Sequence, residues 1–425
     1  FFKREEAMAI SRSVDGPGSA VAGGAVRVAV LCGLVQMLDG YDLSAVGLAA
    51  PAIIKAWGVK PVELTSAFAF SSIGIMVGAM AAGPIADRFG RKPVLLVSVA
   101  LFGIFSLLTV WAPSILALVV MRFFTGIGIG GAMPTTVALT SDYTSDRWRA
   151  SAVMFMFTGN TVGGFFAGQI AAAILPSWGW QGIFVVGGVV PLVLLVLLFF
   201  VLPESAQFQP GQPAVKTNPV AGLFRDGLAA STLLLWAIFL INLLNMYLIG
   251  YWLPTTLTLG GLTASSAAFA ASIYAAGAIV STLVLGPTIA HFGAGRVLAI
   301  SFVVGAISIG IVGSVPLSYG WTLLVLAIAG GGFIGSQLGL NGFAAAIYPT
   351  EVRSTGIGWA LGVGRLGGIL GPVIGGMLLG IGLPPHDVLL FAAGPALVTA
   401  ALVVWLGFVS RNALARSSTL ARSFD

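Results

Sequence analysis

Apolar stretches long enough to cross a lipid bilayer recur along the whole chain. A helix that crosses a bilayer core of about 30 Å needs about 20 mostly apolar residues. Twelve such stretches can be placed, to within several residues: 27–50, 62–86, 93–112, 115–139, 150–174, 181–202, 229–253, 266–289, 296–315, 321–346, 355–380 and 387–409. The sequence therefore predicts an all-α membrane protein with twelve transmembrane helices.

The composition is that of a surface facing lipid. Of the 425 residues, 58% are hydrophobic and 8% are charged, whereas a soluble domain carries roughly 25% charged residues. Cys32 is the single cysteine, and the two histidines, His291 and His386, lie far apart in the sequence. We therefore expect no disulfide framework, no metal site, no cofactor and no enzyme built on a nucleophile–base pair.

The positions of Lys and Arg predict the orientation. With a cytoplasmic N-terminus, sixteen of the 20 basic residues fall in cytoplasmic segments, and two, Lys55 and Lys60, fall outside. Arg122 and Arg365 fall within spans. Because basic residues collect on the cytoplasmic side of membrane proteins, both termini are predicted to be cytoplasmic. The net charge of +6 is then a feature of membrane topology, and no nucleic-acid partner is expected.

A polar break with four prolines, residues 203–228, separates six spans from six. The expected organisation is a cytoplasmic segment 1–26, a first half 27–202, a linker 203–228, a second half 229–409 and a cytoplasmic tail 410–425. The halves repeat at an offset of 203 residues: residues 83–95 and 286–298 agree at six of thirteen positions, and Asp39 and Asp42 correspond to Asn242 and Asn245. Two repeated halves around a central site are a known transporter design.

Several motifs carry a resemblance to a known family. Residues 83–92 (Gly-Pro-Ile-Ala-Asp-Arg-Phe-Gly-Arg-Lys) resemble the loop signature of the major facilitator superfamily, and residues 122–130 resemble its fourth-helix pattern. Residues 39–42 (Asp-Gly-Tyr-Asp) are similar to the DGxD motif of its aromatic acid:proton symporters. Residues 348–356, followed by Gly364-Arg365, also resemble that family. The resemblance implies the two-half major facilitator fold and bacterial uptake of aromatic carboxylates such as benzoate or hydroxybenzoates.

Two departures from the family pattern keep an alternative open. Ala290 and His291 occupy the positions of Asp87 and Arg88 in the second copy of the loop. The Gly-Pro pattern of antiporters is absent from the fifth span, and a similar string ends at Pro372 in span eleven. The alternative is a proton-coupled exporter of drugs or metabolites with the same fold. For either function we expect a monomer in the bacterial inner membrane, with protons, substrate and lipid as partners.

Charged residues inside the spans predict a proton-coupling group. Asp39, Asp42 and Arg122 each cost roughly 2.5–3.5 kcal/mol at mid-membrane. Asp39 and Asp42 are i,i+3 on one helical face, where two carboxylates crowd each other unless a cation or proton intervenes. A structural ion pair is the alternative interpretation.

Arg365 is the predicted clamp for a substrate carboxylate. Its planar guanidinium matches a carboxylate with two parallel hydrogen bonds, and four glycines of the same span leave space around it. Arg122 can do the same or can neutralise the aspartates. We favour Arg365 because the first half already supplies acids to pair with Arg122.

Amide and aromatic side chains are expected to complete the substrate site. These are Asn242 and Asn245 in span seven, Phe333, Gln337 and Asn341 at steps of four in span ten, and Trp252. Helix packing is the alternative for each amide, and anchoring at the lipid interface is the alternative for Trp252. We do not include Tyr41 or Tyr247, since Tyr41 points about 160° away from Asp39.

Charged loop residues are expected to form a conformational latch that stabilises the outward-facing state. These latch residues are Asp87, Arg88 and Arg91 in the first half and Glu351 and Arg353 in the second. A solvated, positively charged cytoplasmic loop is the alternative interpretation.

Overall fold

The computed structural model describes residues 18–205, 219–225, 227–349 and 352–422. Helices make up the first half: α2 (Gly18–Trp57), α3 (Pro61–Phe89), α4 (Arg91–Leu108), the short η1 (Thr109–Trp111), α5 (Ile115–Tyr143) and α6 (Asp146–Val201). The second half contains α7 (Pro219–Gly222), α8 (Ala229–Leu259), α9 (Ala264–Phe292), α10 (Ala294–Ser314), α11 (Tyr319–Gly330), η2 (Gly331–Gly335), α12 (Ser336–Ile347), α13 (Arg353–Gly380) and α14 (Pro385–Arg422).

The longest helix, α6, crosses the molecule twice. If straight, its 56 residues would be about 84 Å long, far more than a bilayer core of about 30 Å. Gly179 interrupts it with φ 61° and ψ −164°, a conformation that glycine adopts without a side-chain clash. Near its two ends, Val201 accepts a hydrogen bond from Arg27 and Arg149 donates one to the Ser141 carbonyl. The C-terminal end of α6 therefore lies near the start of α2, and its N-terminal end lies near the end of α5.

Counting α6 twice confirms the twelve predicted spans. Eleven helices of the described chain are long and apolar enough to cross a membrane, and α6 supplies the twelfth crossing. The helices extend beyond some predicted boundaries. The first, α2, begins at Gly18, and α14 continues as helix to Arg422, through most of the residues expected to form a tail.

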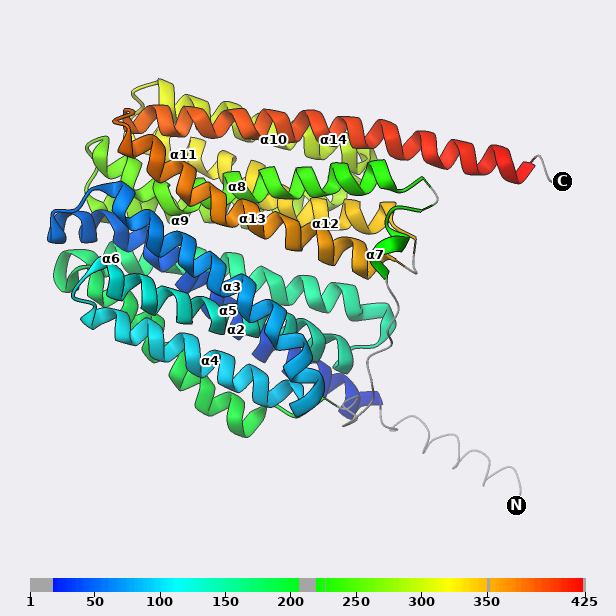
Figure 1. Cartoon of the computed structure of the whole chain (residues 1–425), viewed down its shortest axis with the longest axis horizontal. Coiled ribbons are helices and arrows are strands. Elements are labelled where there is room, and N and C mark those ends of the chain that lie inside the picture. The colour runs from blue at the N-terminus through cyan, green and yellow to red at the C-terminus, as the bar shows by residue number, and fades with distance from the viewer. Residues whose placement is uncertain (1–17, 206–218, 226, 350–351, 423–425) are drawn as a thin grey trace, which may run out of the picture.

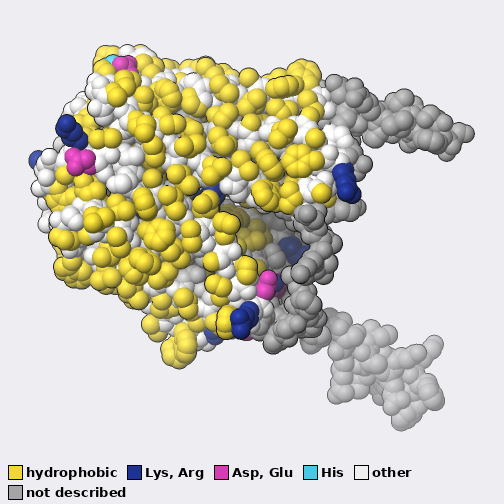
Figure 2. All heavy atoms as spheres, in the orientation of Figure 1, with side chains coloured by type: hydrophobic (Ala, Val, Ile, Leu, Met, Phe, Trp, Pro, Cys, Tyr) yellow, Lys and Arg dark blue, Asp and Glu magenta, His cyan; other side chains and the backbone are white. Residues whose placement is uncertain are grey.

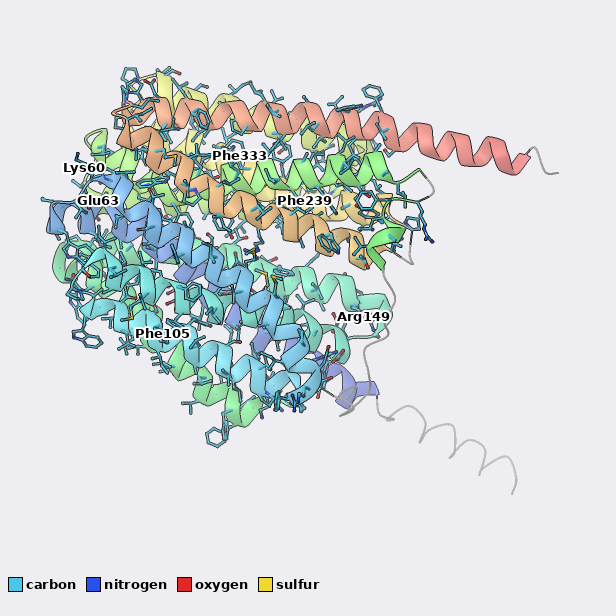
Figure 3. The ribbon with its side chains drawn as sticks, viewed as in Figure 1. Lys60, Glu63, Phe105, Arg149, Phe239 and Phe333 are labelled. Carbon is cyan, nitrogen blue, oxygen red and sulfur yellow. The ribbon has the colours of Figure 1, made fainter. Side chains whose placement is uncertain are left out.

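The molecule has two distinct ends. Gly18 and Arg422, the ends of the described chain, lie at one of them (Figure 1), which we call the terminal end. Lys60 and Glu63, at the start of α3, lie at the other (Figure 3), which we call the opposite end. Between them the visible surface is mostly hydrophobic, with charged side chains near the two ends (Figure 2). This distribution suits a protein whose middle is surrounded by lipid.

The two halves approach each other closely at the opposite end. A Cβ added to Gly168 of α6 would lie 2.7 Å from the Ala268 carbonyl oxygen of α9. One added to Gly47 of α2 would lie 3.0 Å from the Gly250 carbonyl oxygen of α8. Helices can pack this closely because glycine has no side chain. At the terminal end, in contrast, Figure 2 shows a hollow between the halves.

Apolar packing also joins the two halves near the opposite end. The largest buried cluster lies in the second half and includes Phe239 and Phe302. A second cluster, centred on α2, α3 and α6 of the first half, also takes in Tyr251, Trp252 and Ala268 of the second half. The halves therefore share a core near the opposite end.

Span ten contains an irregular turn. The α11 and α12 helices are joined by the π-helical segment η2, Gly331–Gly335. A π turn inserts one extra residue into a helix, so side chains before and after it are out of step with a regular α-helix.

Candidate functional site

Asp42 and Arg122 form an ion pair enclosed within the first half. Arg122 Nη1 lies 3.0 Å from Asp42 Oδ2, and both side chains are at most 2% exposed. Ser106 donates a hydrogen bond to Asp42 Oδ1 at 2.6 Å, and Arg122 Nη2 donates to Thr109 at 2.9 Å. The Arg122 guanidinium also lies over the Phe184 ring, 4.8 Å from its centroid. Both charges are thus neutralised and held by α2, α4, η1, α5 and α6.

Asp39 has a very different environment, although it lies one turn from Asp42. Its side chain is 1% exposed, and within the described chain neither carboxylate oxygen has a hydrogen-bond partner. Arg365 of the second half and Asp42 are near enough to interact with it electrostatically. An ionised carboxylate without partners is costly in such a place, and a bound proton removes that cost. The sequence places the two aspartates in one group, whereas in the structure Asp42 has charged and polar partners and Asp39 has no hydrogen-bond partner among the described residues.

Arg365 of α13 lies between the two halves. Its Nη1 donates to the Tyr247 hydroxyl of α8 at 2.9 Å, and its Nη2 lies 3.0 Å from the sulfur of Met133 in α5. Among the described residues, the ion pairs do not include Arg365. Its guanidinium can therefore accept a carboxylate from a ligand, with the Tyr247 hydroxyl beside it.

The amides of the second half form a short hydrogen-bonded chain. Asn242 donates to Gln337 Oε1 at 2.6 Å, and Gln337 Nε2 lies 3.5 Å from Asn341 Oδ1. The structure thus brings together three of the four predicted amides. The fourth, Asn245, is buried, and no hydrogen bond is made by either of its amide atoms to any described residue.

Phe333 and Trp252 lie in the packed interior. Phe333 belongs to the π turn and is fully buried against Gly305 of α10. Trp252 is also fully buried, which does not fit a lipid-interface anchor. Its indole N–H donates to the Pro372 carbonyl at 2.9 Å, and its ring meets Phe68 edge-on at 5.0 Å between centroids.

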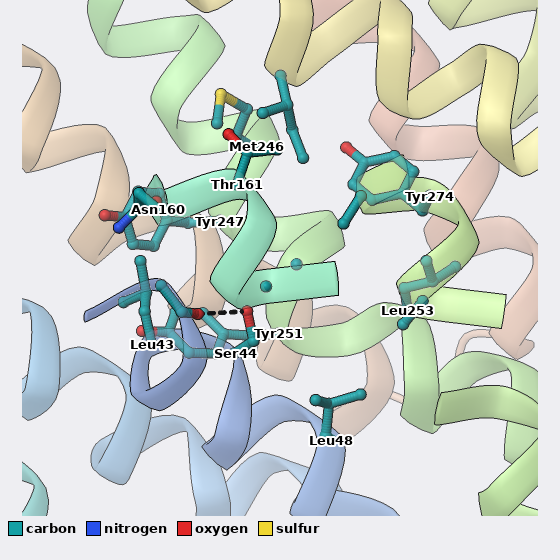
Figure 4. A pocket seen from close by; sticks show the side chains of 16 residues that line it. Leu43, Ser44, Leu48, Asn160, Thr161, Met246, Tyr247, Tyr251, Leu253 and Tyr274 are labelled. Atoms are coloured by element: carbon teal, nitrogen blue, oxygen red, sulfur yellow. Dashed lines mark hydrogen bonds between the residues drawn. The ribbon is translucent and has the colours of Figure 1, made fainter. Parts of the chain in front are cut away.

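A pocket between the halves is bounded in part by Tyr247 (Figure 4). Its volume is about 150 Å³, the size of a cavity known to hold benzene in another protein. The helices α2, α6, α8 and α9 and the segment η2 supply its walls: Gly40, Leu43, Ser44, Leu48, Asn160, Thr161, Gly164, Met246, Tyr247, Gly250, Tyr251, Leu253, Ala271, Tyr274, Ala275 and Ile334.

Most of this pocket is absent from the sequence-based site. The sequence shows Tyr247 only as a polar aromatic residue in a span. It does not reveal the contact with Arg365, which lies 118 residues away in the chain. Asn160, Thr161 and Tyr274 are polar residues in spans, but no motif singles them out. In the ranges that the structure describes, no three His, Cys, Asp or Glu side chains are placed to hold a metal ion.

The predicted latch residues of the first half divide into two groups. Asp87 and Arg88 are exposed at the terminal end of α3. Arg91 instead forms an ion pair with Asp142 of α5. The backbone N–H groups of Arg91 and Lys92 donate to Glu204 Oε1 at 2.9 and 3.1 Å. Glu204 therefore caps the first turn of α4, although no sequence pattern had indicated it.

In the second half, Arg353 begins α13 and donates from Nε to the Tyr348 carbonyl at 3.3 Å. Glu351 lies outside the described residues.

The comparisons with known proteins bear on this two-half bundle directly. The model of the Major Facilitator Superfamily matches the chain in two stretches, residues 32–264 and 235–422. The chain belongs to this superfamily. As a member of the major facilitator superfamily it is a transporter and not an enzyme, and the two six-helix halves are those of that fold.

Curated relatives of this major facilitator chain carry transport names. It is 34% identical to the 4-hydroxybenzoate transporter PcaK of Pseudomonas aeruginosa, covering 90% of this chain and 93% of the relative. It is 35% identical to a gallate transporter of Pseudomonas putida, covering 84% and 86%. It is 37% identical to the 3-(3-hydroxy-phenyl)propionate transporter of Escherichia coli, covering 88% and 92%.

Solved structures show the same fold at lower identity. A D-xylose–proton symporter superposes with a TM-score of 0.72 at 16% identity, covering 89% of this chain and 97% of that one. A bacterial homologue of the lysosomal transporter Spinster, in an inward-facing conformation, gives a TM-score of 0.67 at 20% identity, covering 94% and 98%.

Proposed function

We propose that the protein is a proton-coupled symporter that takes up a small aromatic carboxylate across the bacterial inner membrane by alternating access. Relatives along nearly its whole length are named for transport of 4-hydroxybenzoate, gallate and 3-(3-hydroxy-phenyl)propionate. The observation that best supports the proposal is the position of Arg365. This cation has no carboxylate partner among the described residues, contacts Tyr247 at the edge of a ring-sized pocket, and acts on the buried Asp39.

Charge balance connects substrate and proton in this arrangement. The substrate carboxylate would bind the Arg365 guanidinium through two parallel hydrogen bonds, with the Tyr247 hydroxyl alongside. Arg365 would then be neutralised by the substrate, and an ionised Asp39 would remain as an uncompensated charge in a buried place. A proton on Asp39 keeps the loaded cavity neutral, so loading and protonation favour each other. The enclosed Asp42–Arg122 pair would hold α2 in place beside it.

The basic residues favour a cytoplasmic terminal end. Arg27, Arg88, Arg91 and Lys92 lie there, whereas Lys55 and Lys60 flank the loop at the opposite end, and basic residues collect in the cytoplasm. The hollow at the terminal end would then face the cytoplasm, and the conformation would be inward-facing.

The proposed latch fits this conformation. In an inward-facing state the two halves are apart at the cytoplasmic side. The exposed side chain of Asp87 would then be a latch residue whose contacts are broken in this state. We propose that Asp87, Arg88 and Arg91, with Glu351 and Arg353 of the second half, stabilise the outward-facing state when the hollow closes.

Transport into proteoliposomes tests the function. Radiolabelled 4-hydroxybenzoate, benzoate and a sugar would be offered with and without an inward-directed proton gradient. The aromatic acids should accumulate with the gradient, and the sugar should not. Asp39→Asn keeps the side-chain shape but cannot titrate, so it should abolish gradient-driven accumulation. Glu63→Gln, an acid at the opposite end, is the matched control and should transport normally.

Two results would overturn the proposal. Full gradient-driven accumulation by Asp39→Asn would remove Asp39 from proton coupling. Extrusion of substrate against proton flow would replace the symporter by the exporter.

A further inference from the structure

The hydroxyl group of Tyr274 is an unused hydrogen-bond donor in the wall of the pocket. Tyr274 lies on α9, is 4% exposed, and its hydroxyl has no hydrogen-bond partner in the described chain. It is among the residues that line the pocket. In Figure 4 its hydroxyl points into the pocket, towards the side on which Thr161 and Met246 lie. A buried hydroxyl without a partner is costly, so a ligand group is its natural partner.

Two other hydroxyl groups of this pocket wall form hydrogen bonds within the protein. Ser44 donates to the Gly40 carbonyl at 2.9 Å, and the Tyr247 hydroxyl accepts from Arg365. The Tyr251 hydroxyl, like that of Tyr274, has no hydrogen-bond partner in the described chain. The Tyr251 ring, however, stacks on Phe68 of α3 with 4.7 Å between centroids, and its hydroxyl lies beside Ser71 and Ser72 of the same helix. Tyr274 differs from Ser44 and Tyr247 because its hydroxyl has no hydrogen-bond partner in the described chain. It differs from Tyr251 because it lies on α9, whereas the Tyr251 ring packs against α3.

Two of the three tyrosines that line the pocket, Tyr247 and Tyr274, give a bound aromatic acid a direction. Tyr247 contacts Arg365 and marks the end where a carboxylate would bind. A single aromatic ring fits the pocket volume of about 150 Å³, because a cavity of this size can hold benzene. The apolar lining of Leu43, Leu253 and Ile334 suits the faces of a ring. Tyr274 is then left to contact a substituent on the ring.

We propose that Tyr274 donates a hydrogen bond to a hydroxyl at the meta or para position of the substrate ring and so makes the transporter selective for hydroxylated aromatic acids. The inference rests on the proposed function, since it requires an aromatic carboxylate in this pocket. An unsubstituted ring fills the space, excludes water and leaves the Tyr274 hydroxyl without a partner. Leaving a buried donor unsatisfied weakens binding about 5- to 150-fold. A hydroxyl at the ortho position lies beside the carboxylate, at the Arg365 end, and does not relieve this loss.

Direct binding to the purified full-length protein tests the assignment. The ligands are benzoate and 2-, 3- and 4-hydroxybenzoate, measured by calorimetry on wild type and on Tyr274→Phe. Wild type should bind the 3- or 4-hydroxy acid about 5- to 150-fold more tightly than benzoate, and 2-hydroxybenzoate should behave like benzoate. Tyr274→Phe removes one oxygen atom, so it should lose this preference while its affinity for benzoate stays equal or rises.

Tyr251→Phe is the matched control. It removes a hydroxyl from a ring that lines the same pocket but whose oxygen lies beside α3, so the preference for hydroxylated acids should persist. An unchanged preference in Tyr274→Phe, or an equal loss in Tyr251→Phe, would overturn the assignment of Tyr274.

A second variant tests whether the ring occupies this pocket at all. A Cβ added to Gly250, in the pocket wall, would meet no atom within 4 Å, so the first carbon of the new side chain in Gly250→Val has room, and its methyl groups should reduce the space for a ring. This variant should fold and should lose affinity for all four acids by about tenfold or more, because overpacking costs about 1–3 kcal/mol. Undiminished binding would place the ring elsewhere and overturn the inference. If wild type bound none of the acids, the proposed function itself would fail, whereas equal binding of all four would reject only the role of Tyr274.

Discussion

Equivalent positions in the two halves of the molecule have opposite patterns of hydrogen-bond partners. In the first half, Asp42 is paired with Arg122 and Ser106, whereas Asp39 has no hydrogen-bond partner among the described residues. In the second half the pattern is reversed. Asn242, the counterpart of Asp39, is bonded to Gln337, and Asn245, the counterpart of Asp42, has no described partner.

The two intramembrane arginines also differ in their partners. Arg122 is enclosed with a carboxylate in its own half, whereas Arg365 reaches across to Met133 of the other half and has a hydroxyl, not a carboxylate, as its second contact. Among the described residues, the first half therefore contains one neutralised buried pair and one buried acid without a hydrogen-bond partner, and the second half contributes an arginine without a carboxylate partner. In the proposed function, the buried Arg122 thus has a structural role, and the partly buried Arg365 has the binding role.

The largest expected effect tests the structural role of the enclosed pair. Arg122→Leu leaves Asp42 as an unpaired buried charge, and breaking such a pair typically costs about 3–5 kcal/mol. Thermal unfolding in detergent should show a large loss of stability, which Asp42→Leu/Arg122→Leu should largely restore. Asn245→Leu, at the equivalent position of the second half, is the control and should change stability by less than about 1 kcal/mol. Equal losses in both halves would remove the contrast.

Next in size is the loss of binding at the free cation. Arg365→Lys cannot present two parallel donors to a carboxylate, and losing one partner of a buried charge pair typically costs about 2–5 kcal/mol, or about 30- to several-thousand-fold in affinity. Calorimetry with 4-hydroxybenzoate would measure it, with Arg296→Lys, at an exposed arginine near the start of α10, as control. Wild-type affinity in Arg365→Lys would transfer the carboxylate clamp to Arg122 and reverse the assignment of the two arginines.

A third variant asks whether the halves move as separate bodies. In Gly168→Val the new Cβ would lie 2.6–2.9 Å from atoms of Ala268 and Ser272 in α9, so closure of the opposite end would be opposed. Overpacking of this kind costs about 1–3 kcal/mol, which shifts a two-state population about 5- to 150-fold. Distances between spin labels across the opposite end should lengthen. Gly310→Val, where an added Cβ meets nothing within 4 Å, should leave them unchanged.

The smallest effect concerns the amide chain of the second half. Asn242→Ala removes the hydrogen bond to Gln337, and such bonds between membrane helices contribute about 0.6–2 kcal/mol. A double-mutant cycle with Gln337→Ala would isolate the pair. A coupling energy above about 3 kcal/mol would show that this pair is as important to stability as the Asp42–Arg122 pair and would contradict the contrast between the halves.

The sequence predicts the spans and the halves well because hydrophobic length is a local property. It also identifies the charged residues inside spans, since each stands out in an apolar run. It does not distinguish Asp39 from Asp42, because their partners come from helices far along the chain. The even spacing of Phe333 and Gln337 suggested a shared face, but the π turn Gly331–Gly335 changes the helical phase between them. Phe333 packs against α10, and Gln337 meets Asn242.

The close approach of the halves at the opposite end has a consequence for energy conversion. The contacts there join glycines to backbone carbonyls, as at Gly47 and Gly168, and add hydroxyl and amide groups such as the Gln169–Ser272 bond. None of these groups gains or loses a proton near neutral pH, so these contacts do not themselves make closure of the opposite end depend on pH. In the proposed symporter, the electrochemical work of the proton would then enter the cycle at the centre of the molecule, through the charge state of Asp39 and Arg365. The contacts at the opposite end would then open and close through rigid-body motion of the two halves, without binding the proton themselves.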